Sequence, residues 1–285
     1  MPTTAQLRQM HEPVLVSIAH AGFETALASA IFDNLQATGP LCFNNFAYAL
    51  REFLRHVFHR LAPDECVTNT SWFKPDMTSQ NGITRAHRSK YMLQGGLSDL
   101  YVTKKLMVDV DAVNDDLSDV FKVLSSFTHI GHDTFNLTMA DIEDRAGTCL
   151  DSTKYLIDHI AVCRRRVLDA LGHEVDQHLI NEVISETNLE LDEIATHHRI
   201  DNVYVESSEV TDIGVHDLTI DVEGTVGVEL QYGSGSDVRN DIGAVVDNSF
   251  PFTAQVKVKF QRPLGKFATV VGFKVDTSSW YGDDT

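Results

Sequence analysis

The sequence lacks several motifs that identify common enzyme classes. It has no GxxxxGK phosphate-binding loop and no GxSxG elbow, so P-loop nucleotide hydrolysis and serine esterase chemistry have no support. Its four cysteines, Cys42, Cys66, Cys149 and Cys163, form no CxxC pair, which argues against a zinc knuckle or a disulfide framework. The N-terminal region lacks a basic segment followed by an apolar run, so we expect a cytoplasmic protein with no membrane partner.

Positive charge is also scarce, except in one segment. The chain carries 23 Lys and Arg against 41 Asp and Glu, a formal net charge of −18. Between Asn44 and Lys105 the balance reverses, with nine Lys and Arg against five Asp and Glu. An acidic protein repels nucleic acid in general, so this basic segment is where a polyanion would bind.

The hydrophobic pattern changes near residue 198. Before that point apolar residues recur at helical spacing, and the helices expected from it cover about 14–35, 44–62, 84–94, 109–127, 141–171 and 173–195. Afterwards apolar and polar residues alternate, as at Val226, Val228 and Leu230, which is the period of half-buried strands. We therefore predict an α+β fold, with an N-terminal helical bundle over residues 1–198 and a smaller antiparallel β domain over residues 199–285.

The helix expected from Asn44 to Ala62 combines an apolar face with a basic one. The apolar sector holds Phe46, Leu50, Phe53, Leu54, Val57 and Leu61, and the opposite sector holds Arg51, Glu52, Arg55, His56, His59 and Arg60. Arg51 and His56 fit the loose Arg-x(4–6)-His spacing of metal-independent ribonucleases of the HEPN class. There the arginine holds the scissile phosphate and a histidine with a near-neutral pKa moves the proton of the 2′-hydroxyl. The alternatives are a solvated helical face and simple anion binding.

A neighbouring helix adds further positive charge. Arg85, His87 and Arg88 fall in the first turns after Thr84, where the helix dipole favours an anion. The residues that we expect to contact nucleic acid are Arg55, His59, Arg85, Arg88 and Lys90. The aromatic residues that could stack on unpaired bases are Trp72, Phe73 and Tyr91. In the alternative, these aromatic residues are core and the arginines pair with the acidic helix that begins at Asp109.

His129, His132 and Asp133 form a short cluster after a predicted helix. Their types could ligate a transition metal, but the spacing supplies no third strong ligand. Histidines that interact with the last carbonyls of a helix are the alternative. His129 is also a candidate to join His56 in one catalytic site.

Acidic residues in the β region offer a different nuclease pattern. Restriction-type nucleases place an acid on one strand and an acid or Gln, a spacer and a Lys on the next, so that metal and ammonium meet at the phosphate. Asp241 or Asp247 with the run Gln255-Val256-Lys257 is a degenerate match, and a solvated turn before an ordinary strand is the alternative. We therefore expect no cofactor, with Mg²⁺ as the alternative.

Several longer phrases are distinctive. They are Phe43 to Glu52 leading to Arg60 to Asp64, Gln94 to Asp99, Ser126 to His129, Leu230 to Ser234, Ser249 to Phe252 and Asp276 to Tyr281. Together they resemble a bacterial family of predicted nucleases associated with prokaryotic PIWI modules. The resemblance spans most of the chain and implies a role in phage defence. The sequence departs from a restriction-type site by lacking a clean Glu-x-Lys.

These features together predict an endoribonuclease of antiviral defence. Arg51 would bind the phosphate, His56 would be the general base or acid and His129 would assist. HEPN-type sites usually form where two copies of the basic helix face each other, so we also expect a homo-oligomer or a defence-system partner protein. The alternative function is a non-catalytic adaptor or sensor subunit that binds a partner defence protein.

Overall fold

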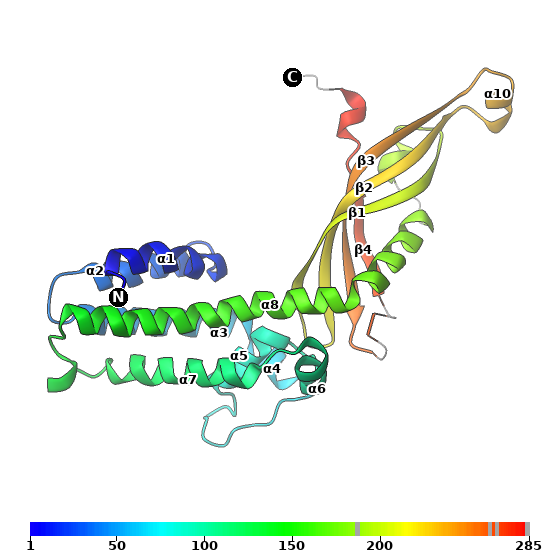
Figure 1. Cartoon of the computed structure of the whole chain (residues 1–285). Coiled ribbons are helices and arrows are strands. Elements are labelled where there is room, and N and C mark those ends of the chain that lie inside the picture. Colours follow the sequence, from blue (N-terminus) through cyan, green and yellow to red (C-terminus); the bar gives the residue numbers. More distant parts are fainter. Residues whose placement is uncertain (186–188, 262–263, 266–267, 283–285) are drawn as a thin grey trace. The chain divides into compact units, whose positions relative to one another are not determined.

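The computed structural model describes residues 1–185, 189–261, 264–265 and 268–282. The chain divides into two compact units, Met1–Cys163 and Arg164–Thr285. The first is helical, and the second contains an antiparallel sheet, so the predicted α+β class is confirmed (Figure 1). Helix α8 (Met139–Ser185) contributes residues to both units. Strands begin at His197, whereas the compact units divide earlier, within α8.

Helix α3 is the central element of the first unit. The helices before α8 are α1 (Thr4–Ile18), α2 (Phe23–Gln36), α3 (Cys42–Leu61), α4 (Asp64–Thr68), α5 (Arg85–Gln94), α6 (Asp99–Tyr101) and α7 (Val110–Ser126). A π-helical turn (Val102–Leu106) follows α6, and a short 3₁₀ turn (His132–Thr134) follows α7. Helix α3 packs against α2, α5 and α7. Its predicted apolar face is confirmed for Phe46, Leu50, Phe53, Leu54 and Val57, which are all buried, whereas Leu61 at the end of the helix is half-buried.

Three predicted helix boundaries were wrong. The helix expected over 14–35 is two helices, separated where Gly22 takes a φ of 90°. Helix α3 begins at Cys42 because the Asn44 side chain donates to the Phe127 carbonyl at 2.9 Å instead of capping the helix. Helix α8 continues through Gly172, where we expected a break, because one interior glycine costs only about 1 kcal/mol. Residues 186–188 of the helix expected over 173–195 lie outside the described residues.

The second unit contains a four-stranded antiparallel sheet in the order β1-β2-β3-β4. Its strands are β1 (His197–Ile213), β2 (Asp217–Tyr232), β3 (Ala244–Lys259) and β4 (Ala268–Val275). Alternate residues of β2 are buried, so the period of two read from the sequence is confirmed. The glycine-rich turn between β2 and β3 contains the short helix α10 (Gly235–Arg239), and the chain ends with a 3₁₀ turn (Ser278–Tyr281). None of the described helices combines the length and the apolar character required to cross a bilayer.

Candidate functional site

A pocket of about 240 Å³ lies where α3, α5 and α7 meet. Helix α3 contributes Arg55, Phe58 and His59 to its lining. The rest of the lining consists of Asn81, Ile83, Thr84, Arg85, Arg88 and Phe121. The rings of Phe58 and Phe121 meet edge to face with their centroids 6.0 Å apart. The pocket therefore combines aromatic surface with three arginines and one histidine.

Three basic residues of α3 recur every four positions. Arg51, Arg55 and His59 follow this spacing, so they lie along one face of the helix. Glu52 holds the first two, with its carboxylate oxygens 3.5 Å from Arg51 Nη2 and 2.8 Å from Arg55 Nε. Burial alone would raise the pKa of Glu52, but the hydrogen bond from Arg55 and the charges of both arginines hold it below its usual value. The charged carboxylate therefore fixes the position of Arg55 at the pocket.

The start of α5 forms the opposite wall. Thr84 caps this helix, because its Oγ1 accepts from the His87 amide at 3.3 Å, while the Thr84 amide donates to His87 Nδ1 at 3.1 Å. The Arg85 guanidinium carbon lies 4.4 Å from the centroid of the Phe121 ring, in a cation–π contact. Within the described part of the chain, Arg85 has no ion pair. Its in-plane donors therefore remain available to an anion.

Arg88 lies beneath the pocket, not at the surface where we expected it. It is only 5% exposed, because its guanidinium donates to the Ala62 carbonyl and to the Asp64 carboxylate. Asp64 in turn accepts from Asn81 Nδ2 at 3.0 Å. Arg88 is therefore a buried anchor that adds positive potential to the pocket without being accessible to a phosphate.

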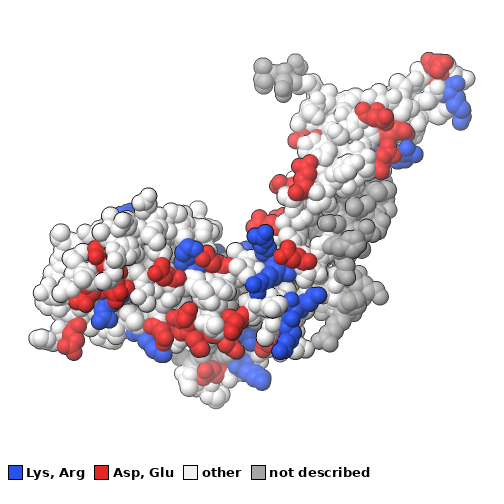
Figure 2. All heavy atoms as spheres, viewed as in Figure 1, with Lys and Arg blue, Asp and Glu red and all other residues white. Residues whose placement is uncertain are grey.

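Two other cations of the basic segment, Lys90 and Arg60, are also engaged locally. Lys90 pairs with Asp99 at 2.7 Å and lies 4.7 Å from the centroid of the Trp72 ring. Arg60 pairs with Glu24 at 2.8 Å. Lys90 and Arg60 pair with acids that lie outside α7, and so do the arginines of α3. Pairing of the basic residues with the aspartates of α7, the alternative considered above, is therefore not observed among the described residues. Figure 2 shows acidic and basic side chains interleaved over the visible face of the helices.

His59 is the titratable group of the pocket with the clearest chemical role. The His59 residue is exposed overall, but partial burial of its ring lowers its pKa, the charge of Arg88 lowers it further, and Asp64 acts in the opposite direction. A lowered pKa keeps the imidazole neutral near pH 7, and a neutral imidazole can accept a proton. Sequence reasoning placed His59 among the nucleic-acid contacts, and only the structure shows the groups that lower its pKa.

The structure shows Arg51, His56 and His129 in different surroundings. Five residues correspond to a rotation of about 140° around an α-helix, so Arg51 and His56 project in different directions. Arg51 Nη1 donates to Thr128 Oγ1 at 3.4 Å, whereas His56 packs edge-on against Phe23 with ring centroids 5.0 Å apart. The two residues are nevertheless linked through Arg55, whose Nη2 lies 3.0 Å from His56 Nε2 and whose Nε shares Glu52 with Arg51. His129 is exposed, and no hydrogen bond or ion pair among the described residues joins its side chain to either of the others.

The second unit contains a carboxylate cluster that sequence reasoning also missed. One oxygen from each of Asp201, Glu229 and Asp247 lies within 4.8 Å of the others, because strand register brings together three separate parts of the chain. Arg199 compensates part of this charge, with its Nε 2.8 Å from Asp201 and its Nη2 3.5 Å from Glu229. Three exposed or half-buried acids and an arginine are also what a solvated sheet surface presents.

Two metal-binding patterns were considered from the sequence, the restriction-type pattern and the His129 cluster. Neither is assembled within the described ranges. Asp247 pairs with Glu229 and Lys257 pairs with Thr219, so this acid and this lysine lie near opposite ends of the same strand. Asp241 lies in the loop before β3. The restriction-type pattern needs its acid and lysine on adjoining strands, and these residues do not provide it. His129, His132 and Asp133 likewise form no three-ligand cluster in the described chain.

Comparison with known families gives two matches. One family model matches residues 17–153 and another matches residues 160–281, and both are described as a predicted pPIWI-associating nuclease. The pocket residues all fall within the first match. No curated protein and no solved structure matches the chain.

Proposed function

The chain belongs to the family of predicted pPIWI-associating nucleases, and on this premise we propose that it is a metal-independent endoribonuclease of antiviral defence. We place the reaction in the pocket between α3, α5 and α7. One observation carries the proposal: the pocket brings His59, a histidine with a lowered pKa, together with Arg55 and Arg85. Attack of a 2′-hydroxyl on the adjacent phosphodiester needs a base for the hydroxyl proton and cations for the phosphate charge. His59 could be that base, and the two arginines could be those cations.

The proposed reaction is an attack of the 2′-hydroxyl oxygen on the adjacent phosphorus. His59 takes the hydroxyl proton as the new O2′–P bond forms. The P–O5′ bond breaks, and the leaving 5′-oxygen takes a proton from water. The products are a 2′,3′-cyclic phosphate and a 5′-hydroxyl end.

The arginines stabilise the charge that develops on the phosphate. Arg55 and Arg85 reach the pocket from opposite walls and would donate to the non-bridging oxygens, which carry more negative charge in the transition state. Arg88, held by the Ala62 carbonyl and the Asp64 carboxylate, supports the pocket from beneath. All these groups come from one chain, so the reaction centre itself does not require a second copy.

A pair of matched histidine variants tests this assignment. Cleavage of an end-labelled RNA is measured in EDTA for the parent, His59→Ala and His56→Ala. Loss of a general base typically costs about 10²- to 10⁴-fold in rate. We expect a decrease of that size for His59→Ala and a much smaller loss for His56→Ala, because His56 contacts Arg55 Nη2 at 3.0 Å but does not line the pocket. Thermal melting of all three proteins checks that the substitutions leave the fold intact.

Three results would contradict the proposal. A large loss of cleavage rate in His56→Ala with little loss in His59→Ala would favour Arg51 and His56, the pair expected from the sequence, as the catalytic residues. Cleavage that requires Mg²⁺ would exclude the metal-independent scheme. An inactive parent under every condition would favour the adaptor function.

A further inference from the structure

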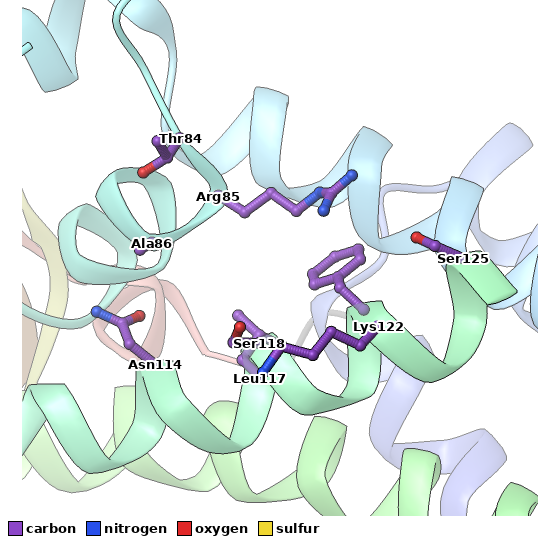
Figure 3. A pocket seen from close by; sticks show the side chains of 9 residues that line it. Thr84, Arg85, Ala86, Asn114, Leu117, Ser118, Lys122 and Ser125 are labelled. Atoms are coloured by element: carbon purple, nitrogen blue, oxygen red, sulfur yellow. The ribbon is translucent and has the colours of Figure 1, made fainter. Parts of the chain in front are cut away.

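A second and larger pocket, of about 400 Å³, adjoins the first (Figure 3). Its lining consists of Thr84, Arg85, Ala86, Asn114, Leu117, Ser118, Phe121, Lys122 and Ser125. Thr84, Arg85 and Phe121 also line the first pocket. An occupant of the second pocket would therefore lie beside a phosphate held in the first.

The second pocket has the chemistry of a nucleobase site. Leu117 and Phe121 give it apolar surface, and Arg85 offers the flat guanidinium that bases of single-stranded RNA stack against. Stacking uses the face of the guanidinium, while its donors point outward in the plane. Arg85 can therefore stack on a base and donate to the neighbouring phosphate at the same time.

Asn114 supplies the group that can identify the base. Its Oδ1 is shielded from solvent and has no hydrogen-bond partner among the described residues. An unmatched buried acceptor is unfavourable, so rotation of the carboxamide that brought Oδ1 to a ligand N–H at this wall of the pocket would be stabilised. A carboxamide offers one acceptor and one donor, which match an exocyclic amino group next to a ring nitrogen. Adenine and cytosine both have such an edge, and a pocket of about 400 Å³ has room for the larger base with its greater stacking surface.

Lys122 lies at the rim of the same pocket. It pairs with Asp119 at 2.7 Å, and both side chains are more than two-thirds exposed. Exposed pairs of this kind contribute little stability, so the ammonium can turn to a phosphate at low cost. The rim therefore offers a cation to the backbone of a bound nucleotide.

We propose that this second pocket binds the nucleobase next to the scissile phosphate and prefers adenine. The inference rests on the proposed function for the position of that phosphate. The base would stack against Arg85, and its amino edge would face Asn114. Nucleotide preference would then be set by α7, whereas bond cleavage would be carried out from α3.

The test compares RNA substrates that differ only in the base beside the cleaved bond. For the parent we expect kcat/KM with adenine to exceed that with uracil roughly 5- to 150-fold, the discrimination typical of one bidentate contact. Asn114→Leu should reduce this ratio to near one while retaining cleavage beside uracil. Ser126→Ala, an exposed position of α7 that does not line the pocket, is the control and should keep the ratio of the parent.

Binding separates failure of this inference from failure of the proposed function. His59→Ala retains every residue of the second pocket, so it should bind an adenine-containing RNA pentamer more tightly than the uracil version, as measured by fluorescence anisotropy. If cleavage is absent but this preference exists and disappears with Asn114→Leu, the base site stands without the reaction. If the parent cleaves RNA but shows no adenine preference, the base site is refuted and the reaction stands. The same conclusion follows if Asn114→Leu cleaves RNA and keeps the preference. Equal binding of both pentamers also refutes it.

Discussion

Arg88 is the buried cation on which we expect the stability of the helical unit to depend most. Arg88→Met keeps much of the aliphatic volume but removes the donors to the Ala62 carbonyl and the Asp64 carboxylate. Hydrogen bonds of a charged group are worth about 1.5–3 kcal/mol each. The Asp64 side chain is 53% exposed, so its hydrogen bond with Arg88 contributes about 1.5 kcal/mol or less. The expected loss in free energy of unfolding is therefore about 3 kcal/mol.

Tryptophan fluorescence can follow this unit separately. The two tryptophans of the chain lie in different compact units, so Trp280→Phe leaves Trp72 as the reporter of the first unit. The Trp72 indole donates to the Gly95 carbonyl at 2.8 Å, and its environment changes on unfolding. Urea titrations with and without Arg88→Met give the difference in unfolding free energy, with the dependence on denaturant unchanged.

An exposed ion pair provides the control. Lys122→Met removes a pair in which both partners are largely exposed, and we expect almost no loss in the free energy of unfolding. A loss of the same size for Arg88→Met would refute the reasoning that the buried guanidinium anchors the pocket. The pH dependence gives a second check, because the hydrogen bond from Arg88 lowers the folded-state pKa of Asp64 below its ordinary value of 3.8. The pair therefore stabilises fully above pH 3.8, and the effect of Arg88→Met should be the same at pH 5 and pH 7.

Two further outcomes follow from the pocket and the sheet. The rate of RNA cleavage should rise with pH through a midpoint below 6.5, because His59 has a lowered pKa and must be neutral to accept a proton; a midpoint above 6.5 would contradict this role. Gly224→Ala should destabilise the sheet by about 1–3 kcal/mol, because its Cβ would lie 2.0 Å from the Tyr204 carbonyl oxygen. Gly235→Ala, with nothing within 4 Å, should have little effect on unfolding followed by Trp280 fluorescence, and equal midpoints for the two variants would exclude the clash.

The parts of the fold that follow from local patterns could be predicted. The buried face of α3 was read correctly from spacing alone, since Phe46, Leu50 and Phe53 recur with the helical period. The start of α5 was also found, because Thr84 caps its own helix within four residues. Interactions of this range are visible in a sequence because both partners lie on one element.

The parts that depend on distant partners could not be predicted. Arg88 looked like a surface cation, and only its pairing with Asp64, 24 positions earlier, shows that it is buried. The pocket depends on three helices that meet, so nothing in the sequence selected His59 over His56. The spacing of Arg51 and His56 satisfied a motif, but it could not show that Arg55 and Glu52 lie between the two side chains in one network.

Substrate chemistry offers the most direct test of the proposed reaction centre. An RNA with a single 2′-deoxynucleotide at the cleaved position is incubated with the parent protein in EDTA, next to the all-ribose RNA. We expect the all-ribose RNA to be cut to a 2′,3′-cyclic phosphate and a 5′-hydroxyl end, and the substituted bond to remain intact, because His59 then has no hydroxyl proton to accept. Cleavage of the substituted bond, or products with 3′-hydroxyl and 5′-phosphate ends, would contradict a reaction that uses the 2′-hydroxyl.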